Sequence, residues 1–382
     1  MVSRRGFGVG VGVSLAAALL LVGCEKDDPN EIKVGAYLSL SGADSTFGTD
    51  TREGIELAVE ETNAAGGVRG KRIRVIYEDD KSNTYEAVQK VRQLIDRNKV
   101  VAILGEVASS RSLAAGLIAN TSHVPMVTPS STAVEVTRNR KWVFRTCFTD
   151  DQQGAVAARF ITNDLKKKKI GLFFAAQDSY SSGLARAFRA EIQKLGGEIV
   201  VDKGYQKGET NFRTYLSELK AANPEVVFVP NYYNEMVLIA RQAKESGIPG
   251  SMFVGGDGWD SSNLVDGAGA ELEGAHFTNH YAPDVPWENS KKFVTAFTAK
   301  YKHLPTSLTA QGYDSAKLLF DAIERATEPT PAAIRDALEA TKDFKGATGT
   351  MTMDKDHNAN KPIVVVRIED KQFRYATQLL AE

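Results

Sequence analysis

Four short polar segments carry the side chains best suited to binding chemistry, and each follows an apolar, strand-like run. They are residues 108–110, 128–132, 231–235 and 255–259. In sheets built from strands and crossover helices, ligands bind beyond the carboxyl ends of the strands. We therefore expect these segments to meet at one binding site, although each one alone also fits a helix cap or an ordinary turn.

The side chains of these segments, together with Tyr180, complement a zwitterion. Hydroxyls such as that of Ser109, with backbone N–H groups at a helix start, favour a carboxylate. The carboxylate of Asp257 favours an ammonium group. The rings of Tyr180 and Tyr232 can cover apolar ligand atoms while their hydroxyls bond a polar edge. An α-amino acid offers all of these groups, so the residues predict amino-acid binding.

The elements that must position these side chains alternate between strands and helices. Apolar runs typical of buried strands are separated by helix-period segments, and they occur at residues 32–38, 72–77, 100–105, 124–127, 170–175, 198–201, 226–229 and 252–255. Such runs suit strands covered on both faces, and the alternation implies parallel sheets with right-handed crossovers. The sequence therefore predicts an α/β fold with two doubly wound sheets.

The last part of the chain is expected to complete these two sheets. It contains helical patterns at residues 290–301, 309–326 and 331–341, followed by a predicted hairpin of residues 363–368 and 373–377. These elements cannot form a third core alone. The chain is therefore expected to cross between two lobes several times.

The N-terminus has the features of an export signal. Ser3-Arg4-Arg5 precedes an uncharged run up to Gly23, which is shorter than a membrane-spanning helix requires. The sequence Leu-Val-Gly-Cys ending at Cys24 resembles the bacterial lipobox, so we expect lipidation of Cys24 and a membrane anchor. A soluble secreted protein is the alternative. The arginine pair leaves Sec or twin-arginine export open.

Charge and motif content argue against several other classes of protein. The chain has 47 basic and 48 acidic residues, interspersed, so we expect no nucleic-acid surface. Once Cys24 is assigned to lipid, Cys147 stands alone and no disulfide is expected. The sequence has no His-Glu-x-x-His, Gly-x-Ser-x-Gly or paired-cysteine metal motif. We therefore expect no enzyme activity, no metal and no cofactor.

Several motifs extend over nearly the whole chain from residue 32 onward. They are LSG (40–42), FG (47–48), NAAGGVRG (63–70), YEDD (77–80), PMVTPSST (125–132), FRT (144–146), YSSGLA (180–185), RQA (241–243) and GDG (256–258). Their order and spacing resemble those of the leucine/isoleucine/valine-binding proteins. That resemblance implies the type I periplasmic binding protein fold, in which a multi-strand hinge joins two lobes.

The resemblance also implies roles for individual residues. Ser109 and Thr132, with the backbone of Ser130, match positions that hold the ligand α-carboxylate. Tyr232 and Asp257 match the partners of the α-ammonium, and Asp257 stands where relatives often have Glu. Because Asp is one methylene shorter, the ammonium must sit deeper or a water must bridge.

The remaining expected site residues surround the ligand side chain. Tyr180 matches the closing residue of the second lobe, and Phe47 matches an aromatic wall. Further positions that could line the pocket or simply pack in the core are Val107, Ala108, Trp259 and Leu308. A branched aliphatic ligand fits several of these residues, but Trp259 could also shrink the pocket or stack on an aromatic ligand.

The implied organisation begins with a signal peptide (1–23) and a flexible tether (24–31). The first lobe comprises residues 32–150 plus 280–355, and the second comprises residues 151–279 plus 356–382. A ligand that contacts both lobes would stabilise their closed arrangement.

Such a receptor would serve an ABC importer. The closed form would dock, as a monomer, on the ABC permease in the membrane of a bacterial periplasm or cell surface. Two other functions remain open, namely a sensor of the same fold for an amide or other small carboxylate and a purely structural lipoprotein.

Overall fold

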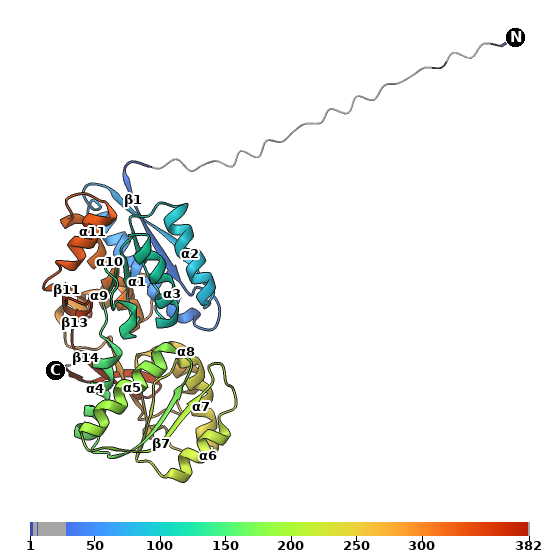
Figure 1. Cartoon of the computed structure of the whole chain (residues 1–382), viewed down its shortest axis with the longest axis vertical. Helices are drawn as coiled ribbons and strands as arrows, with labels where there is room; N and C mark the ends of the chain where they lie inside the picture. The colour runs from blue at the N-terminus through green and yellow to red at the C-terminus, as the bar shows by residue number, and fades with distance from the viewer. Residues whose placement is uncertain (3–5, 7–27, 381–382) are drawn as a thin grey trace.

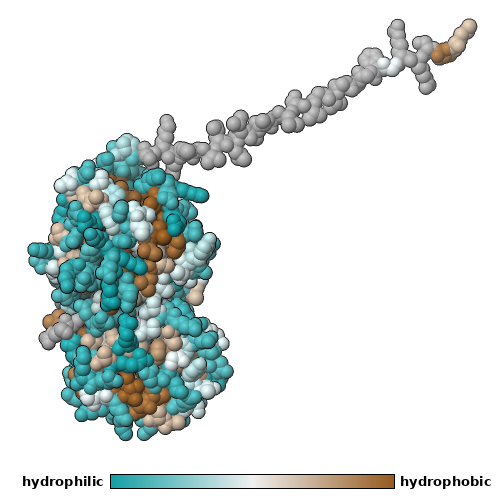
Figure 2. Space-filling view, viewed as in Figure 1, coloured by the Kyte–Doolittle hydropathy of each residue, from teal (hydrophilic) through white to brown (hydrophobic). Residues whose placement is uncertain are grey.

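The computed structural model describes residues 1–2, 6 and 28–380. The described chain forms two α/β bodies stacked along the long axis (Figure 1). In the space-filling view, hydrophilic residues cover most of the visible face, with smaller hydrophobic areas on each body (Figure 2). The predicted signal peptide, most of the tether and the lipidation site Cys24 lie outside the described residues. Within the described residues, no helix is long and apolar enough to cross a membrane.

The upper body of Figure 1 contains a parallel five-stranded sheet in the order β2-β1-β3-β4-β5. Its strands are β1 (Glu31–Leu38), β2 (Arg72–Asp79), β3 (Ala102–Leu104), β4 (Met126–Thr128) and β5 (Val143–Arg145). The helices between them are α1 (Ser45–Ala64), α2 (Thr84–Asp96) and α3 (Ser109–Thr121). The strand order reverses between β1 and β3, so this doubly wound sheet has its switch point there. The segments that start α1 and α3 follow these two strands.

The lower body contains a mixed seven-stranded sheet in the order β15-β14-β10-β9-β8-β6-β7. Its strands are β6 (Lys169–Ala175), β7 (Glu198–Tyr205), β8 (Val226–Val229), β9 (Phe253–Gly255), β10 (His276–Asn279), β14 (Ile363–Glu369) and β15 (Gln372–Leu379). The pairs from β7 to β10 are parallel, whereas β14 pairs antiparallel with both β10 and β15. The sequence-predicted hairpin at residues 363–377 is thus confirmed, and it extends this sheet.

Helices and short 3-10 turns connect the strands of the lower body. The helices are α4 (Asp150–Arg159), which continues as a π-helical turn (Phe160–Asp164), α5 (Ser179–Lys194), α6 (Arg213–Ala222), α7 (Tyr233–Glu245) and α8 (Ser262–Ala268). The 3-10 turn η4 (Asp257–Trp259) follows β9, and η3 (Gly250–Met252) precedes it. The upper body has one such turn, η1 (Val134–Val136). The predicted α/β fold with two doubly wound sheets is therefore confirmed.

Three later helices and a small sheet return to the upper body. These elements are α9 (Glu288–Tyr301), α10 (Ser307–Arg325), α11 (Pro331–Glu339), β11 (Phe344–Gly346), β12 (Gly349–Met353) and β13 (Ala359–Asn360). Helix α10 packs closely along α1, and the backbone N–H of Arg145 in β5 donates to the carbonyl of His357 at 3.0 Å. The chain therefore passes between the bodies after β5, after β10 and before β14. The exact residue limits of the two lobes remain a prediction.

Candidate functional site

A cavity lies between the two bodies, where the polar segments at the strand ends converge. About 240 Å³ of space there, part of it open to solvent, is not occupied by protein atoms. The cavity lining comes from loops and helix starts of both bodies, and consists of Phe47, Val107, Ser109, Ser130, Thr132, Tyr180, Tyr232, Asp257, Gly258 and Leu308. All the residues expected to bind ligand, except Ala108 and Trp259, line this one cavity.

Hydroxyl groups line the wall of the cavity that belongs to the upper body. The Oγ atom of Ser130 and the Oγ1 atom of Thr132 are buried and have no hydrogen-bond partner, although the Thr132 hydroxyl lies near enough to the Asp150 carboxyl to act against the rise of its pKa. Ser109 Oγ accepts the backbone N–H of Ala133 at 3.1 Å, so its own hydroxyl hydrogen is still available. Ser109 also begins α3, a helix start without a side-chain cap. This wall therefore offers hydrogen-bond donors to an anion.

A carboxylate stands on the wall that belongs to the lower body. Asp257 begins η4, and its side chain is held from two other elements. Gln153 Nε2 of α4 donates to Asp257 Oδ1 at 2.8 Å, and His280 Nε2, just beyond β10, lies 3.0 Å from Asp257 Oδ2. Burial lowers the pKa of His280, so its imidazole is neutral at pH 7. The residues lining the cavity include no Lys or Arg.

Aromatic rings close the cavity between the hydroxyl and carboxylate walls. Tyr180 and Tyr232 stack with centroids 5.1 Å apart, and Phe47 of α1 meets Tyr232 edge-on at 5.7 Å. The N–H of Gly258 donates to Tyr180 Oη at 3.0 Å, which leaves the Tyr180 hydroxyl hydrogen free. Burial raises the pKa of Tyr180 well above its ordinary value, so this hydroxyl stays protonated.

Glycine at position 258 is needed for this aromatic arrangement. A Cβ on Gly258 would lie 2.9 Å from the Tyr232 ring and 3.0 Å from the Tyr180 ring. The same Cβ would lie 2.5 Å from the carbonyl oxygen of Asn231. Such contacts are shorter than van der Waals separation, so any larger residue would push the rings apart.

Ala108 and Trp259 do not line the cavity, because both pack behind it. Trp259 is fully buried, and its Nε1–H donates to Asn231 Oδ1 at 2.8 Å. Its ring covers Gly255, where a Cβ would lie 2.2 Å from the indole. Ala108 is the N-cap residue of α3, and its N–H donates to Glu106 Oε2 at 2.5 Å. Both residues support the walls from behind.

A buried charge cluster fixes the starts of the two helices that reach the cavity from the upper body. Arg111 Nη1 lies 2.8 Å from Asp44 Oδ2, and its Nε lies 3.0 Å from Glu106 Oε2. Asp44 precedes α1, which carries Phe47, and Glu106 precedes α3, which begins with Ser109. Arg111 therefore joins the two segments that lead into these helices, each of which carries a cavity-lining residue.

The sequence did not reveal Gln153, His280 or Arg111 as parts of this region. Gln153 and His280 are 104 and 23 residues from Asp257 in sequence, so no local spacing connects them. His280 was one of five scattered histidines. Only the packing of α4 and β10 beside η4 brings them to the carboxylate.

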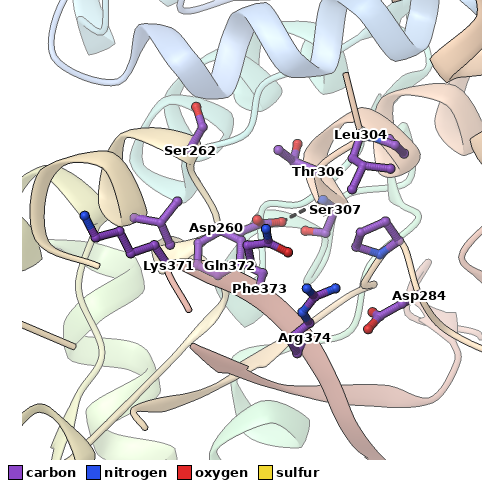
Figure 3. A pocket seen from close by; sticks show the side chains of 13 residues that line it. Asp260, Ser262, Asp284, Leu304, Thr306, Ser307, Lys371, Gln372, Phe373 and Arg374 are labelled. Atoms are coloured by element: carbon purple, nitrogen blue, oxygen red, sulfur yellow. Dashed lines mark hydrogen bonds between the residues drawn. The ribbon is translucent and has the colours of Figure 1, made fainter. Parts of the chain in front are cut away.

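A second, larger pocket opens beside the cavity (Figure 3). It encloses about 920 Å³ between the segment that starts α10 and the β14–β15 turn. Asp260 Oδ2 accepts the backbone N–H of Ser307 at 2.7 Å there, as the dashed line in Figure 3 marks. This hydrogen bond joins the segment after η4 to the first residue of α10, so it connects two walls of the smaller cavity.

Two α/β bodies that enclose a polar cavity at their strand ends define a two-lobed solute-binding protein. The chain belongs to the periplasmic binding protein family, which it matches over residues 31–372. An amino acid binding protein of Pseudomonas aeruginosa is 32% identical over 333 residues, covering 86% of this chain and 88% of that protein. Membership of this family agrees with the expectation of binding and not catalysis.

Solved structures of relatives share the fold over almost their whole length. The leucine binding protein LivK of Thermotoga maritima is 36% identical with a TM-score of 0.87, covering 91% of this chain and 99% of that chain. LivJ of Streptococcus pneumoniae, a branched-chain amino acid transporter substrate binding protein solved with isoleucine, is 33% identical with a TM-score of 0.86. That match covers 92% of this chain and 99% of LivJ. The resemblance to leucine/isoleucine/valine-binding proteins is thereby confirmed.

Proposed function

We propose that this protein is an extracytoplasmic receptor that captures an amino acid, branched-chain or similar, and delivers it to an ABC import permease. The observation that carries the proposal is the pairing of buried, unpartnered hydroxyls with an acid that has no cationic partner in the cavity lining. A buried group of either kind is costly unless a partner satisfies it. An amino acid supplies a carboxylate and an ammonium group together, and the names of the relatives support this ligand class.

The proposed ligand pose uses both walls of the cavity. Ser109, Thr132 and the Ser130 segment bind the α-carboxylate, while Asp257 and Tyr232 bind the α-ammonium. Tyr180 closes the site from the lower body. The ligand side chain then lies against the apolar residues Phe47, Val107 and Leu308.

Ala108 and Trp259 act in this pose as supports for the walls. A branched aliphatic side chain fits the cavity best. The Trp259 indole faces Gly255 and does not enter the cavity, so it is not available to stack on an aromatic ligand. This arrangement favours leucine, isoleucine or valine over an aromatic amino acid.

The proposal also includes export, anchoring and delivery. A signal peptide (1–23), lipidation at Cys24 and a tether (24–31) would hold the monomeric receptor at a bacterial membrane, in the periplasm or at the cell surface. The two lobes, residues 32–150 with 280–355 and residues 151–279 with 356–382, would close on the ligand. A lipid tether raises the effective concentration of the closed receptor beside its permease.

Thermal unfolding of the soluble body, starting after Cys24, tests the ligand class. The protein is first unfolded and refolded to remove bound solute, and then mixed with single amino acids, short amides and other small carboxylates. A ligand that binds only the native state must raise the unfolding midpoint. A shift with leucine, isoleucine or valine is expected, and no shift with any amino acid would contradict the proposal.

Asp257→Ala tests the site itself. The substitution removes the only acid that lines the cavity, so we expect it to abolish amino-acid binding while the fold remains intact. The ammonium would otherwise be buried without a counter-charge, which costs several kcal/mol, about 3 or more. Circular dichroism checks the fold, and calorimetry measures binding. Leucine binding equal to that of the parent protein would show that the site is misassigned.

A further inference from the structure

Asp257 is the one acid in the cavity lining, and its partners differ from those of most buried carboxylates. Buried acids are usually paired with Lys or Arg. Here the side-chain partners are the amide of Gln153 and the imidazole of His280, at 2.8 and 3.0 Å. Each donates one N–H to a different oxygen, and neither cancels the negative charge. The carboxylate is therefore fixed in direction but keeps its charge for another cation.

His280 is held as rigidly as the carboxylate that it contacts. Its side chain is fully buried, and the ring of Phe148 packs over it at 4.1 Å. The backbone N–H of His280 donates to Asn279 Oδ1 at 2.8 Å. Since an ionised carboxylate only accepts hydrogen bonds, Nε2 carries the hydrogen toward Asp257. The other ring nitrogen, Nδ1, is buried without a partner.

Several charged and titratable groups surround this pair. Tyr180, Tyr232 and Asp260 lie close enough to interact with Asp257. The charges of Asp257 in η4 and of Lys361, which precedes β14, act on His280. Asp150, which begins α4, and Cys147, which precedes it, lie close enough to interact with Asp257. Lys361 Nζ is engaged elsewhere, by Thr348 Oγ1 at 2.6 Å. Burial raises the pKa of Asp150 well above its ordinary value.

We infer that Gln153 and His280 are positioning residues that orient the Asp257 carboxylate toward the ligand ammonium. Because both donors are neutral, the negative charge of Asp257 stays available to that ammonium. This inference rests on the proposed function. It also explains how Asp can serve where the resemblance leads one to expect the longer Glu. The two N–H donors fix the orientation of the Asp257 carboxylate, which could otherwise rotate.

The neutral state of His280 has a consequence for binding at acidic pH. Protonated His280 would place a positive charge 3.0 Å from Asp257 Oδ2, where it would compete with the ligand ammonium. The empty site therefore binds this proton more readily than the occupied site, and ligand binding must release it. Affinity then falls as the pH drops through the pKa of His280 in the empty protein.

Calorimetry at pH 7.5, and in steps down to the lowest pH at which circular dichroism shows the parent still folded, tests the inference, using the amino acid that shifts the thermal midpoint most. His280→Leu and Gln153→Leu remove one donor each, and we expect affinity about 10-fold or more weaker at pH 7.5, the scale of a hydrogen bond to a charged group. His280→Gln restores an N–H donor that does not titrate. It should bind at least about threefold more tightly than His280→Leu and lose the pH dependence of the parent.

His276→Gln is the matched control, because His276 begins β10, the strand that His280 directly follows, and its ring lies 5.3 Å from that of Phe160. It should leave both affinity and pH dependence as in the parent. The inference is overturned if His280→Leu and Gln153→Leu bind within about twofold of the parent, or if His280→Gln keeps the parent's pH dependence. If either result occurs while Asp257→Ala still fails to bind amino acids, the inference about Gln153 and His280 fails but the proposed function is not contradicted. If the parent binds no amino acid, both fail together.

Discussion

Single polar atoms distinguish the cavity from the packed interior around it. Thr132 Oγ1 is buried without a partner, whereas Thr128 Oγ1, at the end of the strand that precedes it, donates to the carbonyl of Glu106 at 2.6 Å. Both residues are almost fully buried. A buried hydroxyl with a protein partner stabilises the fold, but one without a partner only lowers stability until a ligand satisfies it. The same residue type therefore has opposite roles at the two positions.

Thr132→Val should separate these roles. Valine has nearly the shape of threonine but no hydroxyl, so the unliganded variant should be as stable as the parent or more stable. Its amino-acid affinity should fall about 10-fold, the value of one hydrogen bond to a carboxylate. Thr128→Val is the comparison, and it should lose about 1 kcal/mol of stability with little loss of affinity. Urea unfolding and calorimetry measure both, and an unchanged affinity for Thr132→Val would argue against a carboxylate at this wall.

The sequence predicted which residues would gather, because strand ends at one edge of a sheet converge wherever the strands are parallel. Ser109 and Thr132 come after strands of the upper sheet, and Asp257 comes after a strand of the lower sheet; the strand ends of the two sheets meet at this cavity. The sequence could not predict the direction of each side chain. Trp259 is two residues beyond Asp257, yet its ring turns back onto Gly255. Whether the lining residues bind ligand remains a prediction.

At the scale of elements, the contact between α1 and α10 positions two of the residues that line the cavity. A Cβ on Gly54 would lie 1.9 Å from the carbonyl oxygen of Thr309, and one on Gly312 would lie 2.3 Å from that of Thr51. The two helices therefore cross with their backbones in contact. This crossing places Phe47 on α1 and Leu308 on α10 at the same cavity.

Gly312→Ala should force these helices apart. The new methyl would meet the backbone of α1, which cannot move aside as a side chain can, so we expect a loss of about 2 kcal/mol or more in stability together with weaker binding. Gly116→Ala in α3 is the control, because a Cβ there would meet side-chain atoms of Arg140, Met126 and Val143 at 3.0 to 3.5 Å and no backbone of another element. Alanine favours helix there by up to about 1 kcal/mol. Equal unfolding free energies for the two variants would mean that the crossing tolerates the methyl.

Apolar runs made most strands predictable, including the three-residue strands β3, β4 and β9, but several other short strands had no such run. The sequence indicated β1, β6 and the β14–β15 hairpin, but no run marked β5 or the strands from β11 to β13. Those strands have two to five residues, too few for a periodic pattern to stand out. They form because neighbouring elements supply their hydrogen bonds, as His357 does for Arg145.

At the scale of the whole molecule, the two bodies contact each other directly at the mouth of the cavity. The Tyr233 hydroxyl at the start of α7 donates to the carbonyl of Ala43 at 2.9 Å, and the hydroxyls of Thr46 and Ser261 share a hydrogen bond of 2.9 Å. Asn234 Nδ2 lies 3.4 Å from Asp44 Oδ1. These contacts join the start of α1 and the residues before it to the lower body. In the proposed closure of the two lobes on a ligand, they stabilise the closed arrangement without touching the ligand, so they set part of the affinity.

Tyr233→Phe should weaken ligand binding through closure alone. The variant keeps the ring, which meets Phe47 at 5.0 Å, and loses only the hydroxyl that bonds Ala43. Tyr233 does not line the cavity, so its effect should appear as a dissociation rate about 3- to 10-fold faster, the value of one neutral hydrogen bond. Tyr313→Phe removes a hydroxyl that bonds Glu61 between α10 and α1, inside the upper body. Because a hydrogen bond within one body cannot favour closure, stopped-flow kinetics should show faster ligand release for Tyr233→Phe only. Equal release rates for both variants would show that the contacts at the cavity mouth do not hold the two bodies together.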